Sequence, residues 1–167
     1  RINPSGKLAI TFPYSTGQIP IYYNRRKSGR WHQGFYKDIT SDPFYSFGHG
    51  LSYTEFQYGV VTPSSTTVKR GEKLSVEVTV TNVGKRDGAE TVHWFISDPY
   101  CSITRPVKEL KHFEKQFIKV GETRTFRFDV DLERDLGFVD GNGKRFLEAG
   151  EYNIWVQDQK VKIELID

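Results

Sequence analysis

The stretch LSVEVTV, residues 74–80, decides the fold. Its apolar side chains, Leu74, Val76, Val78 and Val80, alternate with polar ones. Successive side chains of a β-strand point to opposite faces, so this alternation places one apolar and one polar row on the two sides of a strand. The stretch is therefore predicted to be a strand with one buried face.

The same alternation recurs downstream, and glycine-rich turns such as DGNG (140–143) separate the runs. Short strands at this spacing over about 100 residues predict an all-β, immunoglobulin-like sandwich. Residues 132–136 are expected to form a single helical turn. Most of the core is predicted to come from Leu74, Val76, Val78, Val80, Val92, Trp94, Ile96, Phe126, Phe128, Tyr152, Ile154 and Val156.

Residues 1–55 do not have the pattern of a domain. KLAITF (7–12) and QIPIYY (18–23) are two short strand candidates, and Pro20 restricts the second to an edge. Two strands alone are marginal in water. Yet 13 of the 24 aromatic residues lie within the first 58 positions. We expect this part to be extended, mobile or packed on a neighbour.

Composition narrows the class of protein. The 167 residues are 37% hydrophobic and 27% charged, which is typical of a globular domain, and no apolar run is long enough to cross a membrane. The basic run at 25–27 is expected to be a solvated loop, so nucleic acid is not a predicted partner. The chain has no methionine and is expected to be a processed or cut piece of a longer one.

Few residues suggest chemistry. A single cysteine, Cys101, excludes an internal disulfide and a multi-cysteine metal site. The DGNG stretch superficially resembles a calcium loop, but Lys144 and Arg145 stand where a ligand and a glycine are needed, so a hairpin turn is predicted. Asp38 and Asp42 are expected to be solvated acids. We therefore expect no metal, no cofactor and no catalytic residue in this chain.

Several motifs together identify a family resemblance. Residues 3–30, followed by FGHGLSYTEF (47–56), resemble the C-terminal end of family 3 glycoside hydrolases of the β-glucosidase and β-xylosidase group. Residues 76–99, 105–115 and 149–156 look like the fibronectin type III-like domain of that family. The departures from the family pattern, Ala9, His49, His112 and HWF at 93–95, suggest an unusual branch.

The resemblance implies two parts. Residues 1–58 would be the end of an α/β sandwich domain and its connector, and 59–167 a fibronectin type III-like domain. The family's two catalytic carboxylates would lie upstream. The chain would then be the non-catalytic C-terminal part of a retaining β-glycosidase that hydrolyses terminal β-D-glucosides, inactive alone, periplasmic or extracellular, and partnered by the upstream catalytic domains and, through them, a carbohydrate.

The aromatic stretch FYSFGHGLSYTEF (44–56) is interpreted as the bend between these two domains. Phe47, His49 and Trp31 are candidates for positions near the substrate, with packing between domains as the favoured interpretation. The alternative function is an autonomous carbohydrate-binding or cell-surface module. Such a module needs a planar row of exposed aromatics, whereas Trp94 and Trp155 are expected to be only partly buried strand residues.

Overall fold

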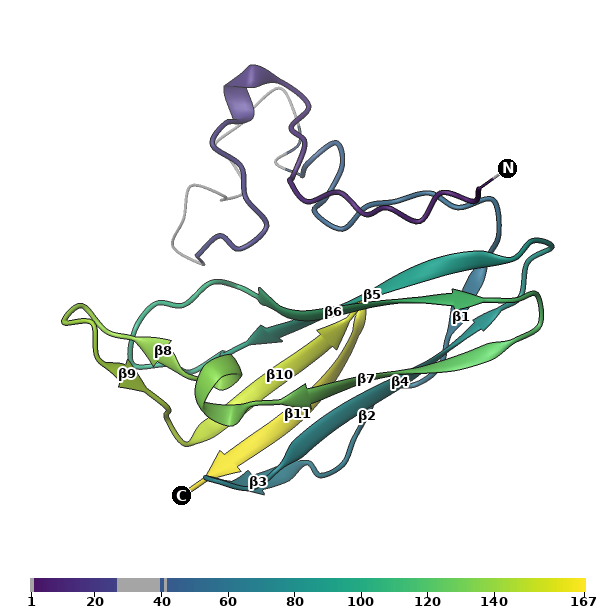
Figure 1. The fold of residues 1–167 in the computed structure, drawn as a ribbon. Helices are drawn as coiled ribbons and strands as arrows, with labels where there is room; N and C mark the ends of the chain where they lie inside the picture. Colours follow the sequence, from purple (N-terminus) through teal and green to yellow (C-terminus); the bar gives the residue numbers. More distant parts are fainter. Residues whose placement is uncertain (1, 27–39, 41) are drawn as a thin grey trace.

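A computed structural model describes residues 2–26, 40 and 42–167 of the chain (Figure 1). Two β-sheets pack face to face, which confirms the predicted sandwich. One sheet has four strands, β1 (Phe56–Tyr58), β4 (Leu74–Asn82), β2 (Thr62–Pro63) and β7 (Thr123–Val130), with β7 paired to β4. The other has the order β3 (Thr67–Lys69), β11 (Gln159–Ile166), β10 (Gly150–Val156), β5 (Gly88–Ser97) and β6 (Glu109–Ile118).

The core lies between the two sheets. All of the predicted core side chains are buried there. Trp94 is completely buried, so the expectation that it is only partly buried is wrong. Its position on β5 has the inward parity of Val92 and Ile96, and its ring lies 6.1 Å from that of Phe128 on the opposite sheet. Burial of such aromatic and aliphatic side chains is the main stabilising term of the sandwich.

Two local predictions are also confirmed. A single helical turn, η2 (Leu132–Leu136), follows β7, and the carboxylate of Asp131 accepts a hydrogen bond from the Arg134 amide at its start. The DGNG stretch joins β8 (Phe138–Val139) to β9 (Arg145–Phe146) as a hairpin. The Asp140 carboxylate accepts hydrogen bonds from two backbone amides inside this turn, as a turn aspartate commonly does.

Residues 2–26 and 42–55, which we call the N-terminal segment, lie over β5 and β6 on the outside of the five-stranded sheet (Figure 1). The predicted strands at 7–12 and 18–23 are wrong. The segment has a 3-10 turn, η1 (Thr16–Gln18), and an isolated bridge between Phe12 and Tyr45. Within the segment, the backbone groups of Leu8 and Phe12 form hydrogen bonds with residues 44–49, but these bonds are too few and irregular for a strand ladder. No helix in the described part of the chain is long and apolar enough to span a membrane.

Candidate functional site

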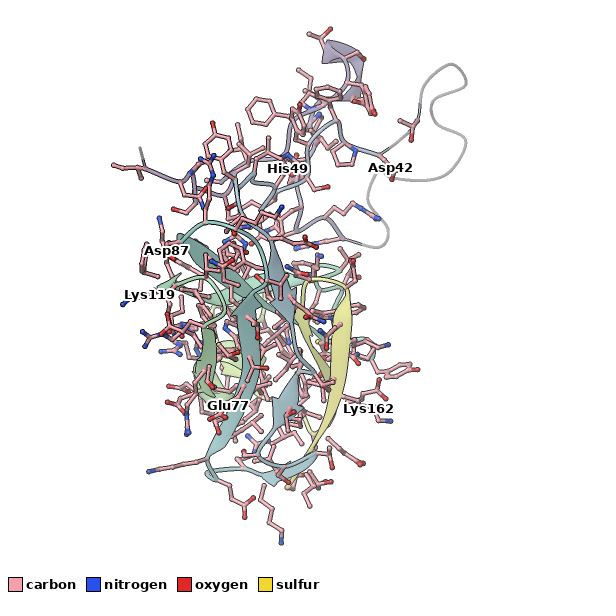
Figure 2. The ribbon with its side chains drawn as sticks, turned by 90° about the vertical axis from the view of Figure 1, so that its right-hand side faces the viewer. Asp42, His49, Glu77, Asp87, Lys119 and Lys162 are labelled. Carbon is pink, nitrogen blue, oxygen red and sulfur yellow. The ribbon has the colours of Figure 1, made fainter. Side chains whose placement is uncertain are left out.

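The N-terminal segment meets the sandwich along β1, β5 and β6, and we call this contact the seam. Its geometry follows from the alternation of β5. Because Val92, Trp94 and Ile96 point into the core, His93 and Phe95 point out toward the segment. In Figure 2 the part of the segment that carries Asp42 and His49 lies above the sandwich.

One half of the seam is aromatic. The rings of Tyr23 and Phe47 stack with centroids 4.2 Å apart, and both meet Phe95 edge-on, at 5.9 and 6.1 Å. The hydroxyl of Tyr23 also accepts a hydrogen bond of 3.3 Å from the backbone amide of Leu110 on β6. Stacked and edge-on rings at these distances attract beyond their simple burial. This cluster therefore attaches the segment to the two strands.

The other half of the seam is a buried charge pair. The Lys7 ammonium lies 2.9 Å from Oε1 of Glu90, and the side chains are 19% and 5% exposed. The Tyr58 hydroxyl donates a 2.8 Å hydrogen bond to the same oxygen. Burial, followed by the negative charge of Glu90, raises the pKa of Tyr58, so its hydroxyl stays protonated as a donor. The pair links the segment to two strands of the sandwich.

His93 lies between the two halves. Burial, and then the positive charge of Lys7, lower the pKa of His93, which favours the neutral imidazole. Gly48 packs directly on this ring: its φ is +82°, and an added Cβ would lie 3.0 Å from Nδ1 of His93. Only glycine takes up this backbone conformation at little cost. Gly48 therefore lets the segment approach β5 closely.

A cavity of about 210 Å³ opens beside the aromatic cluster. Small-molecule sites usually measure roughly 300–1,000 Å³, so this cavity is below the common range. The described residues also contain no group of three or more His, Cys, Asp or Glu side chains that could hold a metal ion. The lining residues of this cavity with polar side chains are Thr11, Tyr22, Tyr23, Arg25, Asp42, Ser46 and Lys108.

The structure separates the residues that the sequence singled out. Phe47 lies at the centre of the seam and lines the small cavity. His49 does not line it; its ring instead stacks on Tyr45 at 4.7 Å. Trp31 lies outside the described residues. Sequence reasoning missed Lys7 and Glu90, although a glutamate at an inward position of β5 was a usable signal of a buried charge.

The chain is similar to known glycosidases over nearly its whole length. Residues 90–160 match the family model of a fibronectin type III-like domain. The chain is 41% identical to the periplasmic β-glucosidase of Salmonella typhimurium, covering 97% of this chain and 22% of that protein. It is 36% identical to a β-xylosidase of Formosa agariphila, covering 93% and 21%.

The chain is also similar to solved glycosidase structures over nearly its whole length. A β-glucosidase from Erythrobacter marinus matches with a TM-score of 0.93 and 37% identity, covering 98% of this chain and 22% of that one. The chain thus spans 21–22% of the length of these relatives. The match extends beyond the fibronectin type III-like domain and includes the N-terminal segment, because nearly all of the chain is covered.

Proposed function

This chain corresponds to the C-terminal portion of a family 3 glycoside hydrolase of the β-glucosidase type, and on that premise we propose that it is the non-catalytic support of a retaining β-glycosidase. The parent protein would hydrolyse terminal β-D-glucosides. Residues 1–58 would complete its α/β domain, and residues 59–167 would hold that part in place.

The proposal rests on the N-terminal segment, whose two sides differ in what they contact. One side is attached to the sandwich through the Tyr23–Phe47–Phe95 cluster and the Lys7–Glu90 pair. The other side exposes large apolar side chains, which soluble proteins seldom leave uncovered in such number. They include Ile10, Phe12, Tyr14, Ile19, Phe44, Tyr45 and Leu51. We infer that the upstream catalytic domains cover this side.

The chemistry of hydrolysis supports placing the catalytic residues in the upstream domains and not in the seam. Retaining hydrolysis needs two carboxyl groups about 5–5.5 Å apart on opposite sides of one glycosidic bond. The seam contains one buried carboxylate, Glu90, and it is occupied by Lys7 and Tyr58. A group held in this way is a structural ion pair and has no free position for a sugar. Phe47 and His49 remain candidates for the border of the parent's substrate entrance.

The proposed location is periplasmic or extracellular, with a carbohydrate as the parent's substrate and no nucleic-acid partner. The relative from Salmonella typhimurium, which is named as periplasmic, supports this location.

The experiment compares the isolated chain with the parent protein on an aryl β-glucoside and an aryl β-xyloside. We expect no turnover by the chain. The parent should release the β-anomer first, as seen by NMR of the fresh product, with the glucoside preferred. Turnover by the purified chain that disappears in Asp42→Asn or Asp38→Asn would contradict the proposal, because the part of the chain before the sandwich would then hold an active site.

A further inference from the structure

A second and larger cavity, of about 520 Å³, lies on the outer face of the five-stranded sheet beyond the seam. Its floor is Ser97 of β5, Asn153 and Trp155 of β10, and Lys160 of β11; its wall is the loop of residues 98–107. Asn153 pairs with Ser97 and Trp155 with Lys160 in the strand register, so the floor stands on three adjacent strands. The volume is within the range usual for small-molecule sites.

The wall of this cavity is anchored rather than loose. The Arg105 guanidinium donates to the Asp98 carboxylate at 3.2 Å and to the Leu136 carbonyl at 2.7 Å, and both charged side chains are buried. Earlier in the same loop, the Ser102 amide donates a hydrogen bond of 3.0 Å to the Glu148 carboxylate. A pocket held in shape before binding loses little entropy when a ligand enters.

The floor offers one flat apolar surface of fixed orientation. The indole Nε1 of Trp155 donates a 2.8 Å hydrogen bond to Oγ of Ser97, which holds the ring in place. The Ser97 hydroxyl keeps its own hydrogen for another acceptor. The Lys160 ammonium lies over one face of this ring, 5.4 Å from its centroid, so a ligand would contact the indole along its other face or its edge. The floor therefore combines an aromatic face with hydroxyl and ammonium donors.

Asn153 supplies the observation that points to a ligand. Its side chain is enclosed, with 5% of the residue exposed, and its Oδ1 accepts no hydrogen bond from the residues that the structure describes. Buried carbonyl oxygens nearly always have a donor. Because Oδ1 itself has almost no accessible surface, a hydroxyl group in the cavity would supply one only after the Asn153 amide turns toward it.

The lining has one unpaired charge, the Lys160 ammonium, which donates hydrogen bonds to hydroxyl groups as well as to anions. Asp98 is balanced by Arg105, which leaves Lys160 as the one lining cation without a carboxylate partner in the described structure. Burial raises the pKa of the Cys101 thiol to about 11, so this lining group is uncharged as well. A polyhydroxylated ring with an apolar face matches all of these groups: hydroxyls for Asn153 and Ser97, and C–H groups for the indole of Trp155.

We propose that this cavity binds a sugar, one or two pyranose units of a neutral glycan. The site goes beyond the proposed support function, because it would hold carbohydrate on the sandwich itself. No bond is made or broken there.

The test is titration of the ¹⁵N-labelled full chain with cellobiose and with xylobiose, followed by NMR. We expect saturable shifts of the Trp155 indole and Asn153 amide signals, with a Kd in the millimolar range. Asn153→Leu and Trp155→Leu should each weaken binding by about tenfold, the effect of losing one hydrogen bond or stacking contact. Glu151→Gln, on the same face of β10 but outside the cavity, is the matched control and should bind normally.

Absence of shifts at Trp155 and Asn153 with both sugars would overturn the proposal, and so would unchanged affinity in both variants. The backbone spectrum of each variant checks its fold, and Trp155→Leu decides the matter if Asn153→Leu does not fold. Failure of this test is distinct from failure of the proposed function, which is measured by hydrolysis in the parent protein.

Discussion

Replacing Lys7 with methionine removes one half of the buried ion pair in the seam and keeps most of the aliphatic chain. Glu90 would then be left under the segment with Tyr58 as its remaining donor among the contacts described above. Breaking a buried pair by removing one partner typically costs about 3–5 kcal/mol. Since Lys7 keeps some contact with solvent and Tyr58 still donates, we expect the lower end, about 3 kcal/mol.

This cost lowers the free energy that holds the segment on the sandwich, because Glu90 is rehydrated when the segment lifts off. The stability of the sandwich itself should not change. The amides of Leu110 and Val107, which donate to the Tyr23 hydroxyl and the Arg25 carbonyl of the segment, report that opening. Hydrogen exchange of these two amides should accelerate about a hundredfold, since each 1.36 kcal/mol is a factor of ten. Amides at the centre of β4 should exchange as in the unmodified chain.

The control variant is Lys162→Met, which removes the exposed Lys162–Glu151 pair on β10 and β11 (Figure 2). Its lysine is 63% exposed, and such surface pairs contribute roughly 0–1 kcal/mol. The double variant Lys7→Met/Glu90→Gln should lose less than the sum of the single losses, because the two groups are coupled. An unchanged exchange rate at Leu110 in Lys7→Met would refute this reasoning.

Three further predictions concern the seam and the core. Gly48→Ala should open the seam, measured as faster exchange at Leu110, because its φ of +82° costs an L-residue about 1–2 kcal/mol and its Cβ would press on His93. Docking should weaken as the pH falls below about 6.5, because the lowered pKa of His93 means that the open state takes up the proton more readily. Above that pH the docking energy is fully present, and His93→Gln should flatten the profile. Trp94→Ala should cost about 3–5 kcal/mol in urea unfolding, since the side chain is completely buried.

Matched variants separate these effects from general damage. Gly141→Ala changes a glycine with open space around it and should leave exchange at Leu110 unchanged. Phe113→Ala removes a ring that is 63% exposed on β6 and should cost far less than Trp94→Ala. Equal losses for Phe113 and Trp94 would mean that the faces of the sandwich are assigned the wrong way round.

The sandwich could be predicted because the side-chain period of a strand is fixed by backbone geometry. Once Leu74 and Val76 are assigned to the core, every second residue follows, and the same reasoning holds for Val92 and Ile96. Trp94 was predicted as a core residue from its alternation and yet expected to be only partly buried when exposed aromatics were considered. Its parity on β5 was the better guide.

The N-terminal segment was harder because a strand is a property of two segments. Residues 7–12 have strand-like composition, yet their partner, residues 44–49, bends at Gly48 and offers only scattered backbone bonds. The seam was missed for a similar reason. Glu90 interrupts an inward apolar row, which marks a buried charge, but its partner Lys7 lies far along the chain and no local pattern connects the two.

The most direct test of the support role is the thermal stability of the parent protein with and without residues 56–167, which include β1 and the rest of the sandwich. The truncated parent loses the surface on which Tyr23, Phe47 and Lys7 dock. We predict that it has a clearly lower Tm and soluble yield, with the catalytic carboxylates intact. An unchanged Tm and unchanged soluble yield would contradict the claim that the sandwich supports the catalytic body.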